Sequence, residues 1–107
     1  MNQFGLSPKH LTLLINTIQK CFGNAAELRI WIFGSRAVEK HRPFSDIDIL
    51  LESPALNFSD LSRLEEEFEE SSLPYKVDLV DLRKISPEYA PSIHASKKLL
   101  FQQKTGE

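Results

Sequence analysis

The sequence of 107 residues lacks the features that mark several common classes of protein. Cys21 is the only cysteine, so no disulfide can form within the chain, as is usual in a reducing cytosol. No apolar run is long enough to span a bilayer, and no secretory signal stands at the N-terminus. We therefore predict a cytoplasmic protein without a membrane partner.

An excess of charge of one sign is also missing, because 13 lysines and arginines stand against 15 aspartates and glutamates. The formal net charge of −2 argues against broad binding of nucleic acid. Gly-x4-Gly-Lys, Gly-x-Gly-x-x-Gly and His-Glu-x-x-His motifs do not occur, so P-loop, Rossmann and zincin sites have no support. An anionic ligand would then require a local positive site or metal ions.

The apolar residues follow helical and strand periods in turn, which predicts one domain over residues 1–107. Ser7-Pro8 starts a helix that Gly23-Asn24 ends, and a second helix begins near Ser59. The predicted strands are residues 28–33, 47–51 and 75–82, with a third helix over 86–96 and a short last strand at 99–101. This order predicts an α/β (α+β) fold, in which helices flank a small mixed sheet of three to five strands.

Two of the predicted strands contain acids where apolar residues are expected. Asp46 and Asp48 alternate at the start of one strand, so they share a face and lie about 7 Å apart along the backbone. Asp78 lies in the middle of a later strand. If these strands are neighbours, the three carboxylates converge and can hold two divalent ions such as Mg²⁺. Taken alone, an Asp-x-Asp pair is more often a turn or a solvent-facing strand.

A glycine and a serine follow the first predicted strand and begin a turn. Gly34 lets a phosphate approach the backbone, while nearby amides and the Ser35 hydroxyl can donate to its oxygens. Arg36 adds a planar cation close by. The predicted site therefore has a phosphate-binding end in this turn and a metal-binding end at the three aspartates.

Three segments together resemble the minimal nucleotidyltransferases (MNT) of the DNA polymerase beta superfamily. They are FGSRA at 33–37, SDIDIL at 45–50 and VDLV at 77–80. The resemblance implies the nucleotidyltransferase fold, ATP as substrate and two Mg²⁺ ions as cofactors. It implies that Gly34 and Ser35 bind the nucleotide phosphates. It also implies that Asp46 and Asp48 bind the metal, and that Asp78 completes the site and activates the attacking hydroxyl.

The small size of the chain is similar to the MntA-like group of this family, whose members are encoded beside a HEPN ribonuclease. This similarity implies an antitoxin that transfers AMP from ATP to a tyrosine hydroxyl of a HEPN toxin. Two alternatives stay open: an antitoxin that acts by complex formation alone, or the nucleotide-binding subunit of a two-protein transferase acting on a small molecule. The sequence departs from the family at Val38 and Glu39, where members often carry a basic residue and a glycine.

Overall fold

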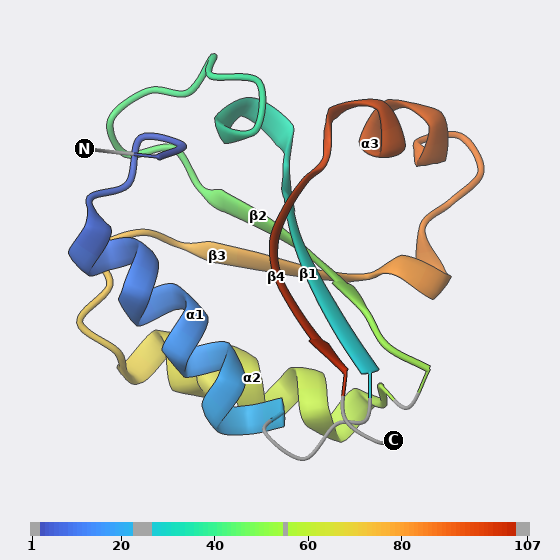
Figure 1. Ribbon diagram of the computed structural model, residues 1–107, viewed down its shortest axis with the longest axis horizontal. Coiled ribbons are helices and arrows are strands. Elements are labelled where there is room, and N and C mark those ends of the chain that lie inside the picture. The colour runs from blue at the N-terminus through green and yellow to red at the C-terminus, as the bar shows by residue number, and fades with distance from the viewer. Residues whose placement is uncertain (1–2, 23–26, 55, 105–107) are drawn as a thin grey trace.

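The computed structural model describes residues 3–22, 27–54 and 56–104, and its strands form one mixed sheet. The order across the sheet is β3-β2-β1-β4 (Figure 1). β1 (Glu27–Phe33) pairs antiparallel with β2 (Ile47–Glu52) and with β4 (Lys98–Lys104). β2 pairs parallel with β3 (Val77–Asp81), the strand that contributes the third acid. The predicted mixed sheet flanked by helices is confirmed.

The first two helices begin where polar side chains cap them. In α1 (Pro8–Phe22), the Ser7 hydroxyl accepts a hydrogen bond from the backbone N–H of His10 at 3.2 Å. In α2 (Phe58–Glu70), Asn57 and Asp60 form a reciprocal capping box, which places the helix start one residue before Ser59. The predicted end of α1 at Gly23-Asn24 lies outside the described residues.

The third helix and the third strand are shorter than predicted, for local reasons. α3 spans Ala90–Ser96, because Ser86 first makes a turn in which its carbonyl accepts the N–H groups of Tyr89 and Ala90. Pro91 is tolerated in the first helical turn, where its missing N–H is not needed. β3 ends at Asp81, whose carboxylate accepts the backbone N–H of Arg83 and opens the 3-10 turn η2 (Leu82–Lys84).

One face of the sheet and the first two helices enclose the core. Residues at alternate positions of β1 and β2 are 0–1% exposed and pack against apolar residues of both helices. The strand members are Leu28, Ile30, Ile32, Ile47, Ile49 and Leu51, and the helix members are Leu14, Ile18, Phe22, Leu64 and Phe68. Each such side chain stabilises the fold by about 1.5–3 kcal/mol when fully buried. α1 and α2 lie together over this face, whereas α3 lies beside the far end of β1 (Figure 1).

The second face of the sheet is more polar and contains the acids of the motifs. The apolar pattern predicts Trp31 as a core residue, but it lies on this second face and is only partly buried. Its indole N–H donates to Glu52 at 2.9 Å, and the Lys97 ammonium lies 4.4 Å from its ring centroid. Within the described ranges, no helix is long and apolar enough to cross a membrane.

Candidate active site

The acids of the two motifs meet on the polar face of the sheet. Asp48 on β2 is paired in register with Asp78 on the parallel neighbour β3, and with Phe33 on the antiparallel neighbour β1. Cross-strand partners project to the same face, so these three side chains form one row across the sheet. Asp46 directly precedes β2 and is exposed. The structure thus places two of the predicted acids side by side, with the third next to them at the strand start.

Burial and neighbouring charge disfavour the ionised form of the central acid. Burial raises the pKa of Asp48, and the charges of Asp78 and Asp46 and a hydrogen bond with the Asp78 side chain raise it further. The Lys76 ammonium, 3.7 Å from Asp78 Oδ1, is mostly exposed. Negative charge at Asp48 is therefore poorly compensated by the protein, and a cation at this position would relieve it.

Gly34 lies directly against the carboxylate of Asp48. Its φ of +76° is in the left-handed region, and a Cβ added there would lie 2.2 Å from Asp48 Oδ2. Only glycine accommodates both this backbone conformation and this contact. Gly34 begins the 3-10 turn η1 (Gly34–Arg36), in which the backbone carbonyl of Ser35 accepts a hydrogen bond from the backbone N–H of Lys40 at 2.8 Å. The predicted phosphate turn and the central acid are therefore in contact.

Arg36 occupies a place that differs from the predicted one. Its side chain is only 1% exposed, and its guanidinium donates to the backbone carbonyls of Phe4, Pro43 and Ser45. The ring of Tyr75 lies 4.7 Å from the guanidinium carbon. Because most of its donors are engaged inside the protein, a phosphate contact from Arg36 is not supported. The residue instead fixes the loop between η1 and β2.

The N-terminal turn that supports this loop has no clear signal in the sequence. Gln3 and Leu6 exchange backbone hydrogen bonds of 3.0 and 2.8 Å, and Phe4 between them has a φ of +57°. Gly5 of the same turn lies so close to His41 that an added Cβ would be 2.1 Å from its Nε2. His41 Nδ1 is buried without a hydrogen-bond partner among the described residues. The turn and the loop therefore pack as one unit.

Two cavities flank the row of acids. A groove of about 640 Å³ runs along β3 and is lined by Asp48 and Asp78. A second cavity of about 350 Å³ lies on the other side of Asp48, between the end of β1 and α3, and Gly34 lines it. Both volumes fall in the range of about 300–1,000 Å³ that is usual for small-ligand sites. The sequence motifs do not indicate the α3 residues of the second cavity.

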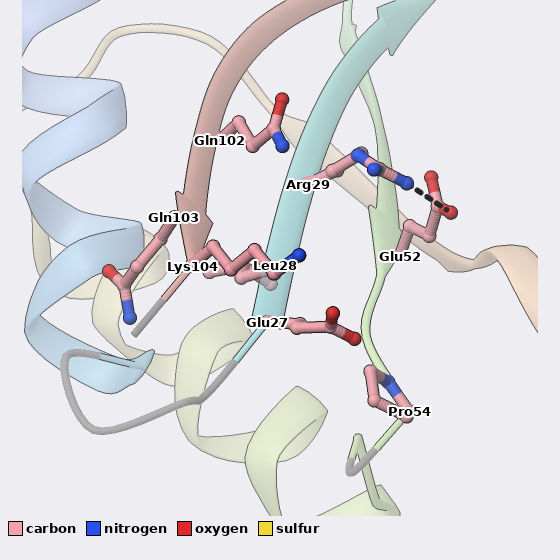
Figure 2. Close-up of a pocket in the computed structure, with 8 residues that line it drawn as sticks. All are labelled: Glu27, Leu28, Arg29, Glu52, Pro54, Gln102, Gln103 and Lys104. Atoms are coloured by element: carbon pink, nitrogen blue, oxygen red, sulfur yellow. Dashed lines mark hydrogen bonds and ion pairs between the residues drawn. The ribbon is translucent and has the colours of Figure 1, made fainter. Parts of the chain in front are cut away.

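A third cavity lies at the opposite end of the sheet and is a poor candidate. Figure 2 shows it between the start of β1 and the ends of β2 and β4, where Arg29 and Glu52 form an ion pair of 3.2 Å. Its volume of about 60 Å³ is well below that of a usual small-ligand site. The acids of the motifs do not line it.

The side chains present do not form a complete metal cage. Among residues 3–22, 27–54 and 56–104, no group of three or more histidine, cysteine, aspartate or glutamate side chains is arranged to hold a metal ion. Asp46, Asp48 and Asp78 are neighbours, but they do not by themselves enclose an ion. The predicted metal role of the three acids stays a prediction at this point.

Comparison with known proteins identifies the family. Residues 16–106 match the family model described as polymerase beta, nucleotidyltransferase, which spans most of the chain. The chain belongs to this nucleotidyltransferase family. A Haemophilus influenzae protein named probable protein adenylyltransferase MntA is 31% identical over 88 residues, which are 81% of this chain and 75% of that protein. The resemblance based on the three motif segments is thereby confirmed.

Solved structures of family members have the same fold. A toxin–antitoxin complex with AMP-PNP contains a chain that matches with a TM-score of 0.64 and 29% identity, over 80% of this chain and 71% of that one. A complex of a tri-AMPylated Shewanella oneidensis HEPN toxin with an MNT antitoxin matches with a TM-score of 0.59 and 28% identity, over 85% and 71%. The predicted nucleotidyltransferase fold is confirmed.

Proposed function

We propose that this nucleotidyltransferase transfers AMP from ATP to a tyrosine hydroxyl of a HEPN-family toxin and thereby acts as its antitoxin. The relative from Haemophilus influenzae is named a probable protein adenylyltransferase, and a matching structure pairs an MNT antitoxin with an AMPylated HEPN toxin. The observation that carries the proposal is the contact of Gly34 with Asp48, beside Asp78. It joins a phosphate-accessible turn to a pair of carboxylates, as nucleotidyl transfer requires. We assign the reaction to the cytoplasm, which fits the single free cysteine.

Different residues of the site are assigned to proton transfer and to phosphate binding. The tyrosine oxygen attacks the α-phosphorus, a new P–O bond forms, and the bond from the α-phosphorus to the bridging oxygen of pyrophosphate breaks. We assign to Asp78 the role of accepting the proton of the phenolic hydroxyl. Asp78 adjoins the open groove along β3, through which a protein side chain can approach. We assign to Gly34 and Ser35 the binding of the phosphates that leave as pyrophosphate.

The acids fit Mg²⁺ when the nucleotide supplies the remaining ligands. Mg²⁺ is commonly bound by one or two carboxylates together with substrate phosphates and water, so a complete protein cage is not needed. Asp48 and Asp78 would provide these carboxylates, and Asp46 at the strand start would provide a third. The raised pKa of Asp48 supports this reading, because the uncompensated charge at the site favours a cation. When bound, Mg²⁺ neutralises charge that develops on the phosphate oxygens.

The test is transfer of label from ATP to the partner. Purified chain, Mg²⁺, ATP labelled on the α-phosphate and a HEPN protein encoded beside this chain should give a labelled HEPN protein. Asp48→Asn and Asp78→Asn should each lower the rate by about 100-fold or more, the usual effect of removing one group that stabilises a transition state. Glu66→Gln, which removes an exposed charge on α2, serves as the control and should leave the rate unchanged.

Two results would decide against the enzyme. Protection from the toxin that survives both aspartate substitutions would identify an antitoxin that acts by complex formation. Label that stays off the HEPN protein but appears on a small hydroxylated acceptor would identify the two-protein transferase instead.

A further inference from the structure

The cavity beside α3 lies on the same face of the sheet as the acids. It is lined by residues from the end of β1 and from α3, namely Phe33, Gly34, Tyr89, Ser92, Ile93 and Ser96. Phe33 is the register partner of Asp48, so its side chain shares the face of that acid at a distance of one strand spacing, about 5 Å. Gly34 contacts the Asp48 carboxylate directly. Two residues that line the cavity, Phe33 and Gly34, are therefore direct neighbours of Asp48.

Its walls are suited to a flat aromatic ring. Phe33, Tyr89 and Ile93 give it apolar sides, while Ser92 and Ser96 add hydroxyl groups. Tyr89 is 61% exposed, which is high for a large aromatic residue, and none of the described residues of α3 is buried. α3 (Ala90–Ser96) therefore contributes little to the core and leaves an aromatic surface open beside Gly34.

We propose that this cavity binds the base of the nucleotide, with Tyr89 as the residue on which the base stacks. The inference rests on the proposed function. In phosphoryl transfer the attacking and leaving oxygens lie roughly in line, on opposite sides of the phosphorus. The groove assigned to the acceptor adjoins Asp78, whereas the turn assigned to the phosphates begins at Gly34, on the other side of Asp48. A ring in the α3 cavity therefore belongs to the nucleotide, not to the acceptor tyrosine.

The experiment compares two ligands that share phosphates and differ in the base. Binding of ATP and of inorganic tripolyphosphate, each with Mg²⁺, is measured by calorimetry in the absence of a HEPN protein. Tyr89→Ala should weaken ATP binding by about tenfold, as expected for loss of one base–aromatic stack. Tyr89→Phe should keep it, since the ring remains. Tripolyphosphate should bind equally well to all three proteins.

A second variant places a larger side chain in the cavity, whereas Tyr89→Ala removes a side chain that lines it. Ser92 is exposed, so Ser92→Trp leaves the core untouched, and it should also weaken ATP binding but not tripolyphosphate binding. Phe58→Ala is the control, because Phe58 is 76% exposed at the start of α2 and does not line the cavity. ATP binding that is unchanged in Tyr89→Ala and Ser92→Trp would overturn the base site alone. A wild-type chain that binds neither ligand would overturn the proposed function as well.

Discussion

Substitution of Gly34 by alanine should damage the site more than the fold. An L-residue in the left-handed region costs about 1–2 kcal/mol, and φ at Gly34 is +76°. The new Cβ would lie 2.2 Å from Asp48 Oδ2 and 3.2 Å from its Cγ, so the carboxylate must rotate away. An off-rotamer side chain costs roughly 0.5–1.5 kcal/mol. We therefore expect a loss of about 1.5–3.5 kcal/mol in the free energy of unfolding.

The functional loss should be larger, because the displaced carboxylate is the central acid of the site. Displacement by about 1 Å can cost on the order of 100-fold in rate, so AMP transfer by Gly34→Ala should fall by about that factor. A double-mutant cycle with Asp48→Ala isolates the steric part, since the Asp48 Cβ is at an ordinary distance of 3.5 Å. Urea unfolding should then show that Gly34→Ala costs less in the Asp48→Ala background, by roughly 0.5–1.5 kcal/mol. An equal cost in both backgrounds would refute the contact argument.

Two further predictions concern stability. Glu39→Gly should raise the free energy of unfolding by about 0.5–1 kcal/mol, because Glu39 has a φ of +59° and glycine relieves that strain. Thermal melts test this, and a similar gain in Lys40→Gly, whose φ is not positive, would contradict it. Burial by itself raises the pKa of Asp81, but hydrogen bonds from the side chain and backbone of Arg83 outweigh it, so the pKa is lowered overall. Ionised Asp81 therefore stabilises the fold above the ordinary aspartate pKa, and this contribution is lost as the pH falls through the lowered value. Asp81→Asn should cost about 1–3 kcal/mol at pH 7, since Arg83 is half exposed and its ion pair is screened. Melts in acid should show this deficit shrinking, and a deficit that is constant with pH would contradict the assignment.

The sheet and the position of two acids could be predicted from the sequence because they follow local rules. Alternation of apolar residues identifies β1 and β2, and a period of two places Asp48 opposite the buried Ile47 and Ile49. The glycine after β1 marks a turn for the same local reason. The metal role of the three acids still rests on chemistry and family resemblance. The described side chains do not form a cage on their own.

Long-range contacts determine the features that the sequence did not indicate. Arg36 stands beside the phosphate turn in the sequence, which suggests a phosphate ligand, yet its partners Phe4 and Ser45 are separated from it by 32 and 9 residues. The cavity beside α3 could not be predicted either, because it forms only when residues 89–96 pack beside the end of β1. Neither contact has a periodic pattern in the sequence.

The departure from the family at Val38 and Glu39 can now be related to backbone conformation. Members often carry glycine where this chain has Glu39, and Glu39 adopts the left-handed conformation that glycine adopts without strain. Glu39 is therefore less suited to this backbone conformation than glycine would be. The strain at Glu39 is expected to lower the free energy of unfolding. Gly34, the glycine in contact with Asp48, is present in this chain.

The buried Arg36 explains how the loop keeps its shape despite that strain. Its guanidinium donates to the carbonyl of Ser45, at 3.1 Å from Nε and 2.8 Å from Nη2, and Ser45 directly precedes Asp46. Arg36 itself is the last residue of η1, two positions after Gly34. One side chain therefore ties the phosphate turn to the start of the strand that carries the acids. Because a buried guanidinium is costly unless all its neighbours are in place, loss of any one partner would loosen this link. The hydrogen bonds of Arg36 therefore connect η1, which begins at Gly34, to the residue that precedes Asp46.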